Sequence, residues 1–298
     1  MKIFSKGWSF NKDGPGNRRI YYLKGCNLRC KWCASPESIN FTDELLFYPE
    51  RAAGEKLDFL CPAGAITDNK LDRSKCGNCR EYQCRRFRHK AMEWAGTEIS
   101  GNEILQEVLD AKDNWSSFAG VTFGGGEPAL QAKELKEVLR LLREHKIATA
   151  IESNGIPEGF VEIVHETDLV ITDLKSGTPE TFRELTGGIL ATVVNHHQYA
   201  ARHAKELLIR IPVITTLNDS EKELTAMSEI LRELNLIRQR ATGRQLQVEL
   251  LKLHHFGQSK YAALNRDYPA AGLPPVPPEK IRFMENLLAN AGIIVVKS

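Results

Sequence analysis

The sequence has little net charge, no long apolar run and no recognisable leader segment. Its 40 lysine and arginine residues nearly balance 38 aspartate and glutamate residues, which gives a formal net charge of +2. This balance argues against a protein that binds nucleic acid through bulk electrostatics. No apolar stretch approaches the roughly 18 residues of a membrane-spanning helix, and the N-terminus lacks the apolar core of a signal peptide. We therefore expect a cytoplasmic protein that binds neither nucleic acid nor a membrane.

The rest of the composition is that of an ordinary globular protein, with 42% hydrophobic and 26% charged residues among 298. At about 150 residues per domain this length predicts about two domains, although an α/β barrel can reach about 250 residues as one. Such a chain can bury a core without disulfides or structural metals. Its seven cysteines therefore need another explanation. An odd number in a cytoplasmic chain argues against a disulfide framework and favours metal binding or catalysis.

The seven cysteines fall into two groups, and none follows residue 84. Thiolates select zinc or iron–sulfur clusters. A structural zinc ion needs four protein ligands, whereas three cysteines on a 4Fe–4S cluster leave one iron open for a substrate or cofactor. A zinc site that borrows a distant fourth ligand is the alternative for the first group. The first group is Cys26, Cys30 and Cys33, and the second is Cys61, Cys76, Cys79 and Cys84.

From about residue 97 onward, strand-like apolar runs alternate with helical repeats, and one further strand precedes the first cysteine group. This order predicts βα units, a parallel sheet and right-handed crossovers. We count about six units, too few for a closed eight-stranded barrel. Asn218 and Asp219 are expected to cap one helix, and a last helix is expected at 279–291. The expected strands are 20–23, 121–123, 148–151, 169–172, 207–211 and 246–251.

Residues 41–96 interrupt the alternation and are predicted to form a small insert, which leaves 1–40 and 97–298 for the barrel. Proline follows Cys61, as it follows the last cysteine of a bacterial ferredoxin run, and Cys76 begins a second such run. In two-cluster ferredoxins the cysteine before proline ligates the cluster of the other run. The second group is thus predicted to be one complete set, with Phe87 at the position of a lost ligand. A four-thiolate zinc site is the alternative.

Several sequence blocks resemble one known family. The first cysteine group, followed by Gly125-Gly126-Glu127-Pro128, resembles the radical S-adenosylmethionine (SAM) superfamily. More narrowly, the chain resembles the glycyl-radical-enzyme activating enzymes, because Asp13-Gly14-Pro15-Gly16 and Arg18 are similar to their N-terminal signature. The matching blocks run from about residue 11 to residue 261 and include 152–155, 173–175, 210–212 and 250–261.

This resemblance implies an α/β fold, an incomplete (β/α)6 barrel with a ferredoxin-like iron–sulfur insert. It implies an oxidoreductase that works anaerobically, in which a 4Fe–4S cluster on the first cysteine group binds SAM at its open iron. One electron from flavodoxin or ferredoxin would cleave SAM to a 5′-deoxyadenosyl radical, which would abstract hydrogen from a backbone glycine of a partner, a glycyl radical enzyme. The second cysteine group would hold one auxiliary 4Fe–4S cluster.

The resemblance also implies a SAM pocket at the carboxyl ends of the strands, where α/β barrels keep their chemistry. Glycines let backbone approach a ligand closely, here the methionine ammonium of SAM. Lys175 is a candidate ligand of the SAM carboxylate, and Glu152 and Asp173 are candidates for holding a monovalent cation. The predicted cofactor-binding residues are Trp32, Ala34, Gly125, Gly126, Glu127, Glu152, Ser153, Asn154, Asp173, Lys175, Arg210 and His254.

Partner contacts are expected at Asp13, Gly14 and Arg18, near the open side of the barrel. Residues 75–90 carry six basic residues against one glutamate, and this stretch is either a docking face for an acidic donor or partner, or a solvated surface. Two rival functions remain. One is a radical SAM enzyme that acts on a small molecule or on ribonucleotide reductase, and the other is a non-enzymatic iron–sulfur or zinc protein.

Overall fold

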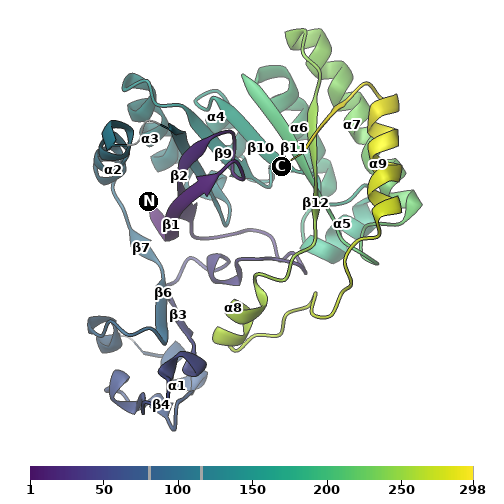
Figure 1. Cartoon of the computed structure of the whole chain (residues 1–298). Coiled ribbons are helices and arrows are strands. Elements are labelled where there is room, and N and C mark those ends of the chain that lie inside the picture. The colour runs from purple at the N-terminus through teal and green to yellow at the C-terminus, as the bar shows by residue number, and fades with distance from the viewer. Residues whose placement is uncertain (80–81, 115–116, 298) are drawn as a thin grey trace.

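The computed structural model describes residues 1–79, 82–114 and 117–297 (Figure 1). Its centre is a nine-stranded sheet in the order β13-β12-β11-β10-β9-β8-β2-β1-β7. The strands are β1 (Lys2–Phe10), β2 (Asn17–Leu23), β7 (Thr97–Glu98), β8 (Phe118–Gly125), β9 (Thr149–Ser153), β10 (Leu169–Asp173), β11 (Glu206–Val213), β12 (Gln247–Lys252) and β13 (Ile294–Val296).

The six predicted strands are present as β2 and β8 to β12, and all neighbours among them pair in parallel. Three strands of this sheet were not predicted: β13 adds a seventh parallel strand, β1 pairs antiparallel with β2, and β7 pairs antiparallel with β1. In the described parts of the chain the sheet begins at β13 and ends at β7 without closing. The predicted parallel α/β architecture is confirmed, and the open sheet agrees with an incomplete barrel.

Helices follow the parallel strands and cover the outer face of the sheet (Figure 1). In α3, Leu135, Val138, Leu139 and Leu142 recur at helical spacing and are buried against the sheet. No helix among the described residues is long and apolar enough to cross a membrane. The helices are α2 (Gly101–Asn114), α3 (Ala132–Glu144), α4 (Gly159–Val164), α5 (Pro179–Thr186), α6 (Leu190–His203), α7 (Glu221–Thr242), α8 (Gln258–Ala263) and α9 (Pro278–Asn290).

The expected helix cap at Asn218 and Asp219 is wrong. The hydroxyl of Ser220 instead accepts the N–H of Glu223 at the start of α7. Asn218 is buried, and its amide nitrogen donates to the carbonyl oxygens of Lys175 at 2.9 Å and Pro212 at 2.7 Å. It therefore ties the segment after β11 to the segment after β10, which carries site residues.

Residues 44–95 form a small lobe beside the main sheet (Figure 1). Two antiparallel strand pairs, β3 (Glu44–Phe47) with β6 (Met92–Ala95) and β4 (Ile66–Thr67) with β5 (Lys70–Leu71), lie in it with the short helix α1 (Arg73–Gly77). The lobe has a hydrophobic cluster of its own. We propose that this lobe is the small insert predicted at residues 41–96. Short 3-10 turns are Pro36–Ser38, Pro49–Ala52, Asp58–Leu60, Gln83–Arg86 and Pro128–Gln131.

Candidate active site

A cavity of about 340 Å³ lies at the carboxyl ends of the parallel strands, and all three cysteines of the first group line it. This volume is within the range of about 300–1,000 Å³ that is usual for small-molecule sites. Parallel strands bring residues that are far apart in sequence to one edge of a sheet, so the structure places eleven of the twelve predicted cofactor-binding residues here. They are Trp32, Ala34, Gly125, Gly126, Glu152, Ser153, Asn154, Asp173, Lys175, Arg210 and His254.

The cysteine loop after β2 is held by backbone hydrogen bonds to two other parts of the chain. On one side, the N–H of Gly25 donates to Ser38 and that of Cys26 to Ile39, at 2.7 and 2.9 Å. On the other side, the N–H groups of residues 29 and 31 donate to the carbonyl oxygens of residues 186 and 185 at the end of α5. A loop without regular secondary structure is thereby fixed, which a cluster ligand set requires.

The first cysteine group suits an iron–sulfur cluster better than free thiols. Burial raises the pKa of Cys26 to about 12 and those of Cys30 and Cys33 to about 11. Thiolates, the form that ligates metal, therefore need a strong cationic partner at neutral pH, and iron supplies one. Three soft ligands around one ligand-sized cavity fit a 4Fe–4S cluster with an open iron beside bound SAM.

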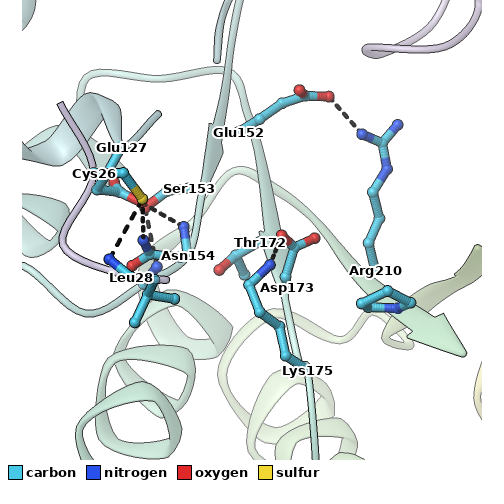
Figure 2. Close-up of polar contacts among 12 residues, drawn as sticks. Cys26, Leu28, Glu127, Glu152, Ser153, Asn154, Thr172, Asp173, Lys175 and Arg210 are labelled. Carbon is cyan, nitrogen blue, oxygen red and sulfur yellow. Dashed lines mark hydrogen bonds and ion pairs between the residues drawn. The ribbon is translucent and has the colours of Figure 1, made fainter. Parts of the chain in front are cut away.

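Lys175 places a positive charge beside these thiols. Its Nζ lies 2.5 Å from Oδ2 of Asp173, two residues earlier on the same face of the chain (Figure 2). Burial alone would lower the pKa of Lys175, but the charges of Asp173 and Cys30 outweigh burial and raise it. The ammonium is therefore charged at neutral pH and available to a carboxylate in the cavity.

Arg210 joins three parts of the barrel across its interior. Its Nη1 lies 2.5 Å from Oε1 of Glu152 and its Nε lies 2.7 Å from Oε2 of Glu249 (Figure 2 shows the first pair). Its other Nη donates to the carbonyl oxygen of Lys12, in the turn between β1 and β2. Burial raises the pKa of Glu152 to about 8, although Arg210 opposes this, and Asp13 nearby raises it further.

Glu127 lies behind the cavity and does not line it. It is fully buried, and burial raises its pKa to about 7. Its Oε1 accepts the Ser153 hydroxyl at 2.7 Å, and its Oε2 accepts the Asn154 N–H at 2.6 Å (Figure 2). Its Oε1 also accepts the Ala129 N–H at 2.9 Å. Its contacts in this structure are those of a brace between the ends of β8 and β9.

Replacing Glu127 by alanine is expected to destabilise the protein by about 3 kcal/mol, because three buried donors lose their acceptor. Urea unfolding of the full chain, followed by circular dichroism, measures this. The matched control is Glu134→Ala, which removes an exposed carboxylate on α3 and should stay within about 0.5 kcal/mol of the parent. Equal free energies of unfolding for the two variants would contradict the bracing role.

Of the three predicted partner contacts, Arg18 is only 3% exposed. Its Nε donates to the Thr122 hydroxyl at 2.7 Å, and its Nη atoms donate to the carbonyl oxygens of residues 119, 121 and 148. Gly14 and Arg18 line a second cavity of about 730 Å³ at the start of the strands, which Arg210 also borders. Asp13 lies close enough to Glu152 to raise its pKa.

The second cysteine group also converges, in the small lobe. All four of its thiols line one cavity of about 20 Å³, and three of them line a neighbouring hollow of about 400 Å³. Burial raises the pKa of Cys84 to about 11, and the other three cysteines add to this shift. Four thiolates are a complete ligand set for an iron–sulfur cluster or zinc. In the described residues, no three His, Cys, Asp or Glu side chains are arranged to hold a single metal ion.

Phe87 packs against the hydrophobic cluster of this lobe and contacts Phe59 edge-on, with ring centres 5.9 Å apart. The aromatic ring thus fills core space at the position where we predicted a lost ligand.

Two histidines that support the site were not predicted from the sequence. Nδ1 of His196 lies 2.8 Å from the carbonyl oxygen of Gly155, and Nε2 of His197 lies 3.0 Å from the hydroxyl of Thr172. Burial lowers the pKa of His197 to about 3, so its ring is neutral. Both come from α6: His196 supports the turn after β9, and His197 supports the end of β10. Adjacent histidines in a helix match no ligand spacing, so only the tertiary contact reveals them.

A family model described as the radical SAM superfamily matches residues 20–227. The chain belongs to the radical SAM superfamily. The 4-hydroxyphenylacetate decarboxylase activating enzyme of Clostridioides difficile (strain CD196) is 30% identical over 295 residues, which cover 94% of this chain and 90% of that one. The benzylsuccinate synthase activating enzyme of Thauera aromatica is also 30% identical, with 95% and 88% covered.

A third relative, the isethionate sulfite-lyase activating enzyme of Desulfovibrio desulfuricans, is 33% identical, with 86% of this chain and 84% of the relative covered. These relatives confirm the predicted group within the superfamily, the glycyl-radical-enzyme activating enzymes. The crystal structure of Streptococcus suis SuiB bound to S-adenosylmethionine shares the fold, with a TM-score of 0.53, 13% identity, and coverage of 94% of this chain and 49% of that one. Membership in the radical SAM superfamily implies a 4Fe–4S cluster that binds SAM.

Proposed function

We propose that this radical SAM enzyme activates a glycyl radical enzyme by abstracting a hydrogen atom from a backbone glycine of that partner. One observation carries the proposal: three cysteines and eleven predicted cofactor-binding residues line a single cavity in a chain whose relatives are activating enzymes. When bound, the cluster and SAM supply the radical chemistry, in which one electron yields methionine and a 5′-deoxyadenosyl radical. Hydrogen transfer from glycine then yields 5′-deoxyadenosine and a glycyl radical.

The residues of this chain would bind and orient SAM and keep water away. The Lys175 ammonium is suited to the methionine carboxylate of SAM, because it is charged and faces the cysteine loop. Gly125 and Gly126 leave room at the cavity wall for the methionine ammonium. Glu152 and Asp173 are each paired with a cationic side chain, and a monovalent cation near them stays a prediction.

The test is anaerobic incubation of the reconstituted enzyme with SAM, a one-electron reductant and a candidate glycyl radical enzyme. We expect an electron paramagnetic resonance (EPR) doublet from a glycyl radical and one 5′-deoxyadenosine per radical formed. Ribonucleotide reductase and a glycyl-to-alanine variant of the partner serve as controls. A radical on ribonucleotide reductase alone, or turnover of a small molecule without any partner, would replace the proposal by one of the rival functions.

We further infer that the second cysteine group holds one auxiliary 4Fe–4S cluster. Its four thiols lie around one cavity, and no fifth ligand is needed. Iron analysis after anaerobic reconstitution should give about eight irons per chain, as two clusters require. About four irons together with one zinc would instead assign the zinc alternative to this group.

The electron donor is proposed to dock on the small lobe beside that cluster. The side chains of Lys75, Arg86, Arg88 and Lys90 are exposed there. Arg85 is exposed as well, but it pairs with Asp43 and lies over the Trp94 ring, so its side chain is held against the lobe. Arg80 and Glu81 of the same predicted basic stretch lie outside the described residues. An exposed basic face beside a redox centre fits an acidic donor such as flavodoxin.

Reversing charge with Arg86→Glu and Arg88→Glu together is expected to slow reduction by flavodoxin about tenfold at low salt, because steering by the field of the lobe is lost. Stopped-flow absorbance at two salt concentrations measures this. A matched control, Lys133→Glu with Arg240→Glu, makes the same change in net charge on exposed positions of the barrel. Equal slowing in both double variants would show that net charge alone matters.

A further inference from the structure

The side chain of Asn154, directly after β9, uses both of its N–H groups within this chain. Its Nδ2 donates to Oδ1 of Asn27 at 2.9 Å and also faces Sγ of Cys26, 3.9 Å away (Figure 2 shows the contact with sulfur). Its Oδ1 accepts the N–H of Ile156 at 3.1 Å. Asn154 is buried, whereas its partner Asn27 is exposed.

The orientation of this amide follows from its partners. The backbone N–H of Ile156 can only donate, so Asn154 must present its oxygen there and its nitrogen toward the cysteine loop. The backbone is fixed as well, because the N–H of Asn154 donates to the buried carboxylate of Glu127 at 2.6 Å. The amide nitrogen is therefore held against the sulfur before any cofactor is bound.

We propose that Asn154 is a positioning residue for the radical SAM cluster and is not a ligand of SAM. Its amide donates a hydrogen bond to the Cys26 sulfur and thereby eases reduction of the cluster. A donor to a ligating sulfur stabilises the added negative charge of the reduced cluster and so raises its reduction potential. The N–H of Leu28 donates to the same sulfur at 3.5 Å. Asn154 adds a second donor from the segment after β9, and unlike a backbone N–H its side chain can be replaced.

This role separates Asn154 from the ligand role that its place in the cavity and its sequence block predict. Both N–H groups are already used, so a hydrogen bond to SAM would break one of them. The affinity for SAM should therefore hardly depend on Asn154, whereas the potential of the cluster should depend on it. A residue that contacts SAM would show the opposite pattern.

The test is an EPR-monitored redox titration of the reconstituted full-length protein without SAM. The signal of the loop cluster is recognised by its change when SAM is added, since only that cluster has an open iron. In Asn154→Ala we expect the ratio of reduced to oxidised cluster at a fixed potential to fall about threefold. At 59 mV per decade for a one-electron couple, this is a reduction potential lower by about 28 mV. The dissociation constant for SAM should stay within about twofold of the parent value, because all three partners of the amide belong to this chain.

Two further variants complete the test. Asn154→Asp keeps the shape of the side chain and the acceptor for Ile156, but its side chain has no N–H. The reduction potential of the cluster should therefore fall at least as far as in Asn154→Ala. Asn27→Ala removes the other acceptor of the same Nδ2 and should leave the reduction potential of the cluster at the parent value. The inference is overturned by an unchanged potential in iron-loaded Asn154→Ala, by weaker SAM binding at unchanged potential, or by loss of iron from both Asn154 variants.

This inference rests on the proposed function only through the loop cluster. Parent protein that takes up no iron would defeat the proposed function itself. Iron-loaded parent protein with a normal response to SAM, combined with unchanged potentials in the Asn154 variants, would defeat the inference alone.

Discussion

Cys30→Ala is expected to abolish the reductive cleavage of SAM, with no 5′-deoxyadenosine above the level of enzyme-free controls. Cys30 lines the cavity together with the other two cysteines of its loop and lies near Lys175. With two thiolates left, the cluster loses one of its three protein ligands and the geometry that leaves a single iron open for SAM. Chromatographic analysis of dithionite-reduced reactions measures the product directly.

The iron content distinguishes this effect from general misfolding. Iron in Cys30→Ala should fall from about eight to about four per chain, because the second cysteine group is untouched. A reciprocal variant, Cys84→Ala, should lose auxiliary iron and still show an EPR signal that responds to SAM. Undiminished 5′-deoxyadenosine from Cys30→Ala would refute the assignment of the first cysteine group.

Gly126→Ala is expected to reduce SAM cleavage about a hundredfold, since displacing a reacting group by about 1 Å can cost that much. A Cβ at this position would lie 2.2 Å from the carbonyl oxygen of Gly25 and 3.1 Å from that of Leu23. Both are backbone atoms at the start of the cysteine loop and cannot rotate away. The added methyl must therefore push the loop, including Cys26, out of its position.

The control for this substitution is Gly7→Ala in β1, where a Cβ would meet no atom within 4 Å. Iron content, SAM cleavage and unfolding by urea should be compared for both variants. If Gly126→Ala matched Gly7→Ala in all three, close packing of the two glycine segments would not control the cluster loop.

The sequence predicted the parallel strands and the gathering of the site well, for a physical reason. Buried parallel strands read as short apolar runs between helical repeats, and residues that follow such strands must meet at one edge. Trp32, Glu152, Lys175 and His254 therefore reach one cavity although they span most of the chain. The order of the strands and helices along the chain was therefore enough to predict that these residues meet.

The directions of individual side chains could not be predicted in the same way. Glu127 belongs to a cofactor motif, yet it points behind the cavity because three buried donors need an acceptor there. Arg210 was expected at a strand end, but it lies within β11 and is paired with Glu249 on the neighbouring strand. Strand β1 was missed because it lies antiparallel beside β2 and mixes lysine and serine with its apolar residues.

The burial of Arg18 limits what this residue could contribute to the predicted partner contact at the β1–β2 turn. Four of its five N–H donors are taken by the barrel itself, so this guanidinium offers nearly the same surface to any protein that approaches. On the prediction that this turn contacts the partner, selectivity would come from its side chains that reach solvent, which at its tip include Lys12 and Pro15. Redirecting the enzyme to a new partner would therefore begin at the tip of this turn and leave its buried base unchanged.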